Sequence, residues 1–199
     1  MIVLDVMGVI GTVAFALAGA LTGIKKRLDV FGVIMLAITT ATGGGILRDL
    51  LIGNSPPIAL RDPTFVVISI VSALAACFVY QQITRFNYFI QICDAIGLGA
   101  FTAAGANMAI LYDHNTLFIM IVLGLATGVG GGVLRDVFVG EIPFVFRKEV
   151  YAMASIVGAA CFYYTQFALP EPLPMYLCFM VTTAVRVLSI VYDLNLPVV

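Results

Sequence analysis

Charged residues are scarce in this sequence. Only 11% of its 199 residues are Asp, Glu, Lys or Arg, whereas a soluble domain is usually about a quarter charged. Hydrophobic residues make up 62% of the chain, and the mean hydropathy is +1.11. This balance excludes an ordinary soluble domain and is typical of an integral membrane protein. The net charge of −1, with no basic cluster beyond residues 25–27, gives no indication of a nucleic-acid partner.

Residues that support catalysis or metal binding are also scarce. The single histidine, His114, falls in a short polar turn with no serine or cysteine motif to serve. The cysteines stand singly in apolar stretches, without the CxxC or Cys/His spacing of a metal site or disulfide framework: Cys77, Cys93, Cys161 and Cys178. No Walker motif and no GxGxxG sequence occurs. We therefore expect no enzymatic activity, no cofactor and no structural metal ion.

Long hydrophobic runs dominate what is present. About 20 apolar residues cross the hydrocarbon core of a bilayer as a helix. Seven runs reach that length between polar or proline-containing breaks: residues 2–24, 30–52, 64–83, 88–111, 117–140, 150–168 and 174–193. The connections are too short for a second domain, so the sequence predicts one all-α transmembrane domain over residues 1–199. No basic residues precede the first run as in a signal peptide, and we expect that run to be retained as a helix.

Basic residues predict how the seven spans are oriented. Alternate connections lie on opposite sides of the membrane, and one side receives Lys25, Lys26, Arg27, Arg85, Arg147 and Lys148. The other side receives only Arg61. Cytoplasmic loops of membrane proteins carry the excess of Lys and Arg. The sequence therefore predicts an N-terminus outside the cytosol and a cytoplasmic C-terminus.

A short glycine-containing sequence occurs twice, 87 residues apart. Residues 43–49 read GGGILRD and residues 130–136 read GGGVLRD; we call them the first and second glycine segments. The same offset relates four further pairs: Gly53 and Gly140, Pro56 and Pro143, Arg61 and Lys148, and Asp62 and Glu149. Residues 2–83 thus resemble residues 88–168, with 174–193 left as a seventh helix. Three spans in each copy predict an inverted repeat, an architecture whose functional site lies at the repeat interface.

The glycine triplets allow two interpretations. Glycine adopts backbone angles closed to other residues, so the helices over 30–52 and 117–140 could be broken there, which is tolerated at membrane depth where the backbone lines a water-filled path. Alternatively, the glycines only let two helices approach closely. We favour broken helices that line a pore, because the triplet occurs twice and is followed each time by Arg-Asp. The residues concerned are Gly43, Gly44, Gly45, Gly130, Gly131 and Gly132.

Each triplet is followed by an arginine and an aspartate: Arg48 and Asp49 in the first segment, Arg135 and Asp136 in the second. Adjacent residues point about 100° apart on a helix, so pairing within one segment is not expected. We predict pairs across the repeats, Arg48 with Asp136 and Arg135 with Asp49, with a role in gating. Pairing with Asp5 or Asp94 is the more local alternative, and simple marking of the interfacial helix ends is another.

A second repeated charge pair, Arg61-Asp62 and Lys148-Glu149, stands at the entrances to the runs at 64–83 and 150–168. An acid at a helix start is favoured by the helix dipole, so these residues could simply be solvated charges. Together with Arg147 they are also candidates for contacts at a pore mouth or with membrane lipid.

The paired GGG-(I/V)-L-R-D sequences, the Lys148-Glu149-Val150 stretch and the seven spans resemble the trimeric intracellular cation (TRIC) channel family. The likeness is closest to its bacterial branch, often labelled glycine transporter domain, and covers about residues 2–190. The resemblance implies a homotrimer in the bacterial inner membrane, with one K⁺- and Na⁺-conducting pore per subunit lined by the glycine triplets. Permeating K⁺ and Na⁺ and membrane lipid are then the expected partners.

Two transport functions stay open on the residues alone. A cation channel would expose carbonyls and the hydroxyls of Thr39, Thr40, Thr42 and Thr127 to a hydrated ion. A secondary transporter of glycine or another small amino acid would use broken helices as a binding site for one solute. We favour the channel over the transporter.

Overall fold

The computed structural model describes residues 2–83, 86–147 and 150–194. Within these ranges every regular element is a helix: α1 (Ile2–Lys25), α2 (Val30–Leu51), α3 (Ile58–Arg61), α4 (Thr64–Val79), η1 (Tyr80–Gln82), α5 (Phe86–Leu111), α6 (Leu117–Phe138), α7 (Phe144–Arg147), α8 (Val150–Thr165) and α9 (Leu173–Val191). Six helical stretches are long and apolar enough to cross a membrane, and α8 is a shorter apolar helix. The predicted all-helical membrane fold is confirmed.

The helices α2 and α6 have matching limits, because the same kinds of residue begin and end them. Asp29 accepts a hydrogen bond from the backbone N–H of Gly32 before α2, and Thr116 accepts one from Ile119 before α6. After the two helices, Gly53 and Gly140 adopt φ of +71° and +70°. Such left-handed residues commonly end helices and are usually glycine. The 87-residue repeat is therefore visible in local backbone structure at both helix ends.

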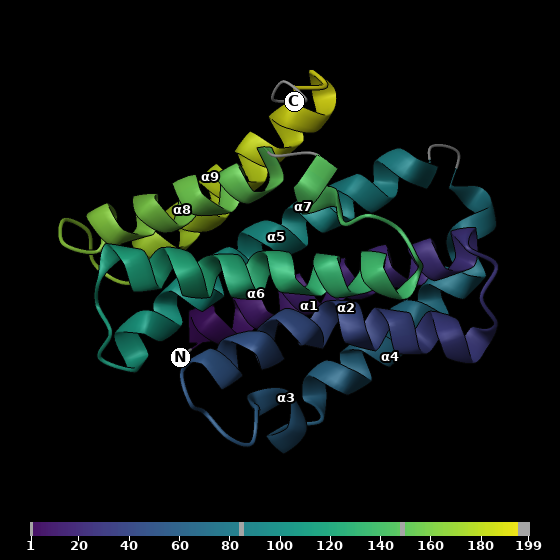
Figure 1. Ribbon diagram of the computed structural model, residues 1–199, viewed down its shortest axis with the longest axis horizontal. Helices are drawn as coiled ribbons and strands as arrows, with labels where there is room; N and C mark the ends of the chain where they lie inside the picture. Colours follow the sequence, from purple (N-terminus) through teal and green to yellow (C-terminus); the bar gives the residue numbers. More distant parts are fainter. Residues whose placement is uncertain (1, 84–85, 148–149, 195–199) are drawn as a thin grey trace.

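The helices α1, α2, α5 and α6 form the centre of the molecule. The helix α1 packs against α2, α4 and α5, while α6 packs against α2, α5 and α8, and α9 covers α5 and α8. Figure 1 shows α3 and α4 along one side of this centre and α8 and α9 along the other. The helices α2 and α6 lie beside each other and run in opposite directions (Figure 1).

The prediction that the helices break at the glycine triplets is wrong. Both α2 and α6 are uninterrupted through the triplets, and the glycines instead bring the two backbones together. A Cβ on Gly44 would collide with the carbonyl oxygen of Thr127, and one on Gly131 would collide with that of Thr40. A Cβ on Gly130 would lie 3.2 Å from the Cα of Gly44. Small residues permit such approach between membrane helices, so close packing of α2 on α6 accounts for Gly44, Gly130 and Gly131.

Candidate functional site

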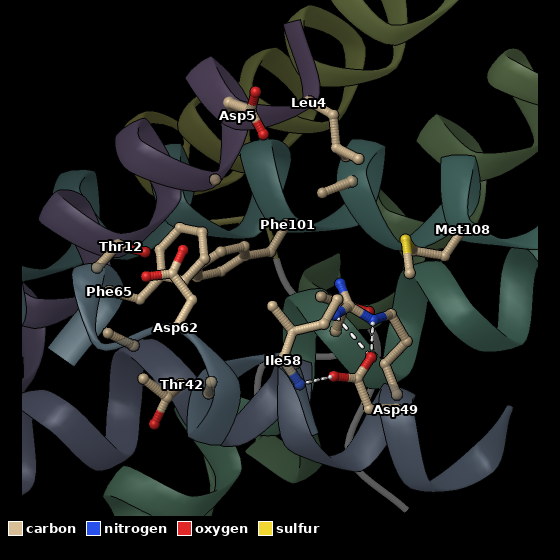
Figure 2. A pocket seen from close by; sticks show the side chains of 17 residues that line it. Leu4, Asp5, Thr12, Thr42, Asp49, Ile58, Asp62, Phe65, Phe101 and Met108 are labelled. Atoms are coloured by element: carbon tan, nitrogen blue, oxygen red, sulfur yellow. Dashed lines mark hydrogen bonds and ion pairs between the residues drawn. The ribbon is translucent and has the colours of Figure 1, made fainter. Parts of the chain in front are cut away.

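A first cavity of about 210 Å³ opens beside the first glycine segment. It extends from Leu4 and Asp5, at the start of α1, to Thr12 near the middle of that helix. Figure 2 shows Asp5, Asp62 and Asp49 around this space, contributed by α1, the loop before α4, and α2. The charged groups lining it are three carboxylates and the guanidinium of Arg48. The cavity is therefore acidic on balance.

Arg48 pairs with its own neighbour in the first glycine segment. Its Nε and Nη2 donate to Oδ1 of Asp49 at 3.0 and 2.8 Å. The predicted pairing of Arg48 with Asp136 is wrong, and so is the argument from helix geometry behind it. The two Cβ atoms diverge, but the arginine side chain is long enough to fold back onto the adjacent carboxylate. Asp49 is fully buried and Arg48 is 9% exposed, so the two charges neutralise each other where water is limited.

A second cavity of about 200 Å³ lies at the opposite end of α1 and α5. Its lining residues come from the end of α1, the start of α5, the second glycine segment and the residues after α6: Thr22, Lys25, Lys26, Asn87, Ile90, Gln91, Arg135, Asp136, Glu141 and Phe144. Lys26 Nζ lies 2.6 Å from Glu141 Oε1 at its edge. With three basic and two acidic groups, this cavity is basic on balance.

Arg135 binds two carboxylates in the second glycine segment. Its Nε donates to Asp136 Oδ1 at 2.9 Å, and its Nη1 donates to Asp94 Oδ1 on α5 at 2.6 Å. The predicted pair of Arg135 with Asp49 is therefore wrong, while the alternative pairing with Asp94 is confirmed. All three side chains are at least 95% buried. Since both arginines find carboxylates on their own or an adjacent helix, no ion pair of the described residues joins the two glycine segments.

The second oxygen of each aspartate organises the chain that follows. Asp49 Oδ2 accepts the backbone N–H of Ile58 at 2.7 Å, and Asp136 Oδ2 accepts that of Phe144 at 2.9 Å. These N–H groups begin the four-residue helices α3 and α7. A carboxylate satisfies donors that a helix start otherwise leaves unpaired. Each aspartate thus accepts hydrogen bonds from its arginine and from the loop that follows. Neither short helix was predicted from the sequence.

The two cavities are separated by packed side chains. Thr12 of the first and Thr22 of the second lie ten residues apart on α1, about 15 Å along the helix. Phe15, fully buried between them, packs edge to face on Phe101 with ring centroids 5.2 Å apart. It also lies against Gly97 of α5 and Gly131 of α6. The centre is closed in this conformation, and sequence analysis did not single out Phe15.

Threonine hydroxyls line both cavities as oxygen acceptors. Thr42 and Thr127 line the first cavity, and Thr22 lines the second. Each hydroxyl donates to the carbonyl four residues earlier in its own helix, at 2.6 to 2.8 Å. With the proton committed to the helix, the oxygen presents lone pairs to its surroundings. Of the two other threonines named from the sequence, Thr40 is fully buried and Thr39 is partly exposed.

The second repeated charge pair is only partly described. Asp62 is exposed and lines the first cavity, while Arg61 is exposed at the end of α3. Hydrogen bonds from the hydroxyl and backbone N–H of Thr64 lower the pKa of Asp62 from its ordinary value, so its carboxylate is charged at neutral pH. Lys148 and Glu149 lie outside the described residues, as does the side chain of Arg147.

Sequence analysis also missed Arg186, which is 4% exposed in α9. Its signal was available, since it is the single Lys or Arg in the last hydrophobic run, and ionisable residues inside membrane spans indicate function. Among the described residues, no group of three or more His, Cys, Asp or Glu side chains could hold a metal ion.

Comparison with known proteins identifies the family. The model described as "Glycine transporter" matches residues 5–81 and, again, residues 91–166. The UPF0126 inner membrane protein YadS of Escherichia coli is 36% identical over 195 residues, which cover 96% of this chain and 93% of YadS. A solved prokaryotic TRIC channel in 0.5 M KCl is 34% identical with a TM-score of 0.92, over 98% of this chain and 99% of that one. The chain belongs to the TRIC family. The TRIC orthologue from Rhodobacter sphaeroides agrees, at 31% identity and a TM-score of 0.92 over 98% of this chain and all of that one.

As a member of the TRIC family, the chain is a multi-pass integral membrane protein. Its relatives and structural neighbours are membrane channels or transporters and not enzymes. The family model's two matches coincide with the two parts of the chain that carry the glycine segments.

Proposed function

We propose that this protein is a monovalent cation channel that passes K⁺ and Na⁺, with one pore in each subunit of a homotrimer. The observation that carries the proposal is the likeness to solved TRIC channels across 98% of the chain at 31–34% identity. Those proteins are described as trimeric intracellular cation channels or as TRIC cation channels. The trimer comes to this chain from that likeness.

The ion path in this proposal joins the two cavities through the centre of each subunit. The cavities approach each other from opposite ends of α1 and α5, which is the form of a pore closed at its middle. Oxygen acceptors from Thr42, Thr127 and Thr22 would replace part of an ion's hydration shell. Neutralised Arg48 and Arg135 would not repel a cation as bare guanidinium groups would. Opening then requires α1 to withdraw Phe15 from between α5 and α6.

The glycine triplets have a different role in this path from the one expected of broken helices. Gly44 of α2 lies against Gly130 and the Thr127 carbonyl of α6, and Gly131 of α6 lies against the Thr40 carbonyl of α2 and Phe15. This close approach would fix α2 and α6 to each other beside the path. Gly45 and Gly132 lie beside the arginine clusters: a Cβ on Gly45 would be 3.8 Å from Arg48 Nη2, and one on Gly132 would be 2.9 Å from the Tyr151 hydroxyl. The segments therefore act as a close-packed contact between α2 and α6.

We also propose that residues 2–83 and 88–168 form inverted repeats with 174–193 as an extra helix. The opposite directions of α2 and α6 (Figure 1) and the matching ends of these helices support this arrangement. The bias of basic residues supports an N-terminus outside and a C-terminus in the cytoplasm. On this orientation the acidic first cavity opens outside and the basic second cavity opens to the cytosol. Arg61 and Asp62 then stand at the outer mouth, and Arg147, Lys148 and Glu149 at the cytoplasmic mouth, within reach of lipid.

A second candidate function is secondary transport of glycine or another small amino acid. The description of the matching family model favours it. Against it, α2 and α6 are not broken, so the half-helix ends that bind a carboxylate and an ammonium in such transporters are absent from both helices.

Recordings from purified protein in planar bilayers under a KCl gradient test the proposal. We expect unitary currents that reverse near the K⁺ equilibrium potential, with a comparable conductance when Na⁺ replaces K⁺. Silent bilayers together with saturable glycine uptake into liposomes would replace the channel with the transporter. Mass measurement of the detergent-solubilised protein tests the trimer separately.

A further inference from the structure

Arg186 of α9 is a buried charge that forms no ion pair with a carboxylate among the described residues. It is 4% exposed, and its Nη1 donates to Ser189 Oγ at 3.2 Å. Its Cζ lies 4.9 Å from the ring centre of Tyr151 on α8. Within the described part of the chain its Nε has no hydrogen-bond partner. Burial of a guanidinium group whose neighbours are an aromatic ring and one hydroxyl costs free energy, unless a nearby excess of negative charge balances it.

Such an excess lies on the far side of Tyr151. The Tyr151 hydroxyl would be 2.9 Å from a Cβ placed on Gly132, and Asp94 Oδ1 would be 3.7 Å from the same point. Tyr151 therefore extends from Arg186 to the space beside Gly132 that Asp94 also faces. The tyrosine hydroxyl is itself buried without a partner among the described residues. Four helices converge here: α5, α6, α8 and α9.

Among the described residues of this region, the buried charges balance only when Arg186 is counted. Asp94 and Asp136 share one arginine, Arg135, which leaves a buried charge of −1. Arg186 brings the sum to zero. The other charged groups that line the second cavity, in the part of the chain that the structure describes, are Lys25, Lys26 and Glu141. Lys26 and Glu141 are partly exposed and engaged with each other, so water and mutual pairing weaken their effect on the buried cluster.

We propose that Arg186 is the counter-charge that keeps the Asp94–Arg135–Asp136 cluster ionised, and is thereby a positioning residue for Arg135 at the second cavity. The seventh helix, which lies outside the repeated part of the sequence, supplies this charge. The first glycine segment does not need such a residue, because Arg48 and Asp49 balance one to one.

Arg186→Met tests the proposal through its dependence on pH. Without the counter-charge, two buried carboxylates share the single positive charge of Arg135. We expect the surplus negative charge to be relieved by uptake of one proton from water, because burial disfavours the charged form of a carboxyl group. A group whose pKa is raised on folding stabilises the fold below that pKa and loses the effect as pH rises through it. The melting temperature of Arg186→Met should therefore fall between about pH 5 and pH 9, while that of the natural protein changes far less over the same interval.

Charge compensation separates this role from simple packing. In Arg186→Met/Asp94→Asn the buried charges again sum to zero, so the pH dependence should disappear even though both side chains have changed. Arg186→Lys should remove most of the pH dependence by restoring the charge. Arg27→Met, at an exposed position that lines neither cavity, is the matched control and should behave as the natural protein. Two outcomes overturn the proposal. In the first, Arg186→Met loses the same stability at all pH values. In the second, adding Asp94→Asn lowers the stability further and leaves its pH dependence unchanged.

Single-channel currents provide a second test of the role of Arg186, and only this test rests on the proposed channel function. Proton uptake by the cluster would weaken the hold on Arg135, so Arg186→Met channels should show a conductance that changes several-fold across the pH interval in which the melting temperature changes. Absence of any current from the natural protein would reject the channel and leave the melting data as the test of Arg186. Normal currents with no pH dependence in either measurement would reject Arg186 as the counter-charge.

Discussion

The two glycine segments share a sequence but differ in how their arginines are held. Arg48 pairs with a single aspartate, its sequence neighbour, and is 9% exposed beside the first cavity. Arg135 pairs with its neighbour and with Asp94, and is 2% exposed. Asp5, which stands three residues before Gly8 as Asp94 does before Gly97, is exposed at the start of α1 and forms no ion pair with Arg48. The two segments therefore share their backbone structure and the ion pair between adjacent arginine and aspartate, while the additional carboxylate, Asp94, is specific to the second segment.

This difference suggests a division of roles between the two ends of the proposed pore. The first cavity reaches from the start of α1 to the middle of that helix, and Arg48 lines it. The second ends at Arg135, which is fixed from two helices. A singly held arginine can move with less loss of interaction energy than a doubly held one. The first segment is therefore better suited to change during opening, and the second to remain fixed.

Removing each arginine in turn tests this difference most strongly. Arg135→Gln leaves two buried carboxylates without their partner, and breaking a buried ion pair in this way destabilises by about 3–5 kcal/mol. Arg48→Gln leaves one carboxylate that still accepts the N–H of Ile58, and we expect about 1–3 kcal/mol. Thermal unfolding of the two purified variants measures the contrast. Equal losses of stability in the two variants would mean that the ion pair with Asp94 does not stabilise Arg135.

The central glycines test what the segments have in common. In Gly44→Ala and Gly131→Ala the new methyl group meets a backbone carbonyl of the opposite helix, which cannot rotate away. Overpacking of this kind destabilises by about 1–3 kcal/mol, and we expect equal losses in the two variants, measured as melting temperature and yield of monodisperse protein.

Gly45→Ala is the matched control for these two variants. Its Cβ would meet nothing closer than Arg48 Nη2 at 3.8 Å, and alanine favours a helix over glycine by about 1 kcal/mol. This variant should be as stable as the natural protein or more so. A loss in Gly45→Ala as large as in Gly44→Ala would argue that the triplet serves backbone flexibility after all.

The glycines that end α2 and α6 predict a smaller and equal effect. Gly53 and Gly140 have φ near +70° and no neighbouring atom within 4 Å of an added Cβ, so alanine there adds backbone strain without a clash. The left-handed conformation disfavours other residues by about 1–2 kcal/mol. Gly53→Ala and Gly140→Ala should each lower the stability by that amount in chemical or thermal unfolding. A marked difference between them would show that the two loops are not equivalent.

Hydropathy predicted the limits of the long helices to within a few residues, because the length of an apolar run is read directly from the sequence. The limits of α2 and α6 were also readable from Asp29, Thr116, Gly53 and Gly140. The helix break was mispredicted because glycine serves both bending and close packing, and only the position of the partner helix decides between them. The cross-repeat ion pairs were mispredicted because backbone geometry ignores the reach of an arginine.

Other features had no signal of sufficient length or regularity. The four-residue helices α3 and α7 are too short to show a hydrophobic period, and they depend on a carboxylate eight or nine residues earlier. Phe15 is one of 14 phenylalanines in the sequence, and nothing but its position between the cavities distinguishes it. The partnership of Arg135 with Asp94 spans 41 residues and required the packing of α5 on α6.

The opposite charges of the two cavities lead to the smallest predicted effect. The first cavity carries Asp5, Asp49 and Asp62 against Arg48, and the second carries an excess of basic groups. A vestibule lined by one sign of charge concentrates counter-ions at its mouth. Cations should therefore enter more readily from the end that begins α1, and single-channel current should be larger in that direction under symmetric KCl.

Asp5→Asn/Asp62→Asn should reduce this current asymmetry, whereas Lys25→Gln should leave the entry of cations from the first cavity unchanged. Both aspartates are exposed, so their field is screened within about 8 Å at physiological salt and about 3 Å at 1 M. The difference between the double variant and the natural channel should therefore be clear in dilute KCl and vanish in concentrated KCl. Because hydrogen bonds from Thr64 lower the pKa of Asp62, its contribution should persist in the Asp5→Asn channel as the solution is acidified to about pH 4. An asymmetry that survives high salt would have to come from the arrangement of Phe15 and the arginine pairs, and not from the charges at the mouths.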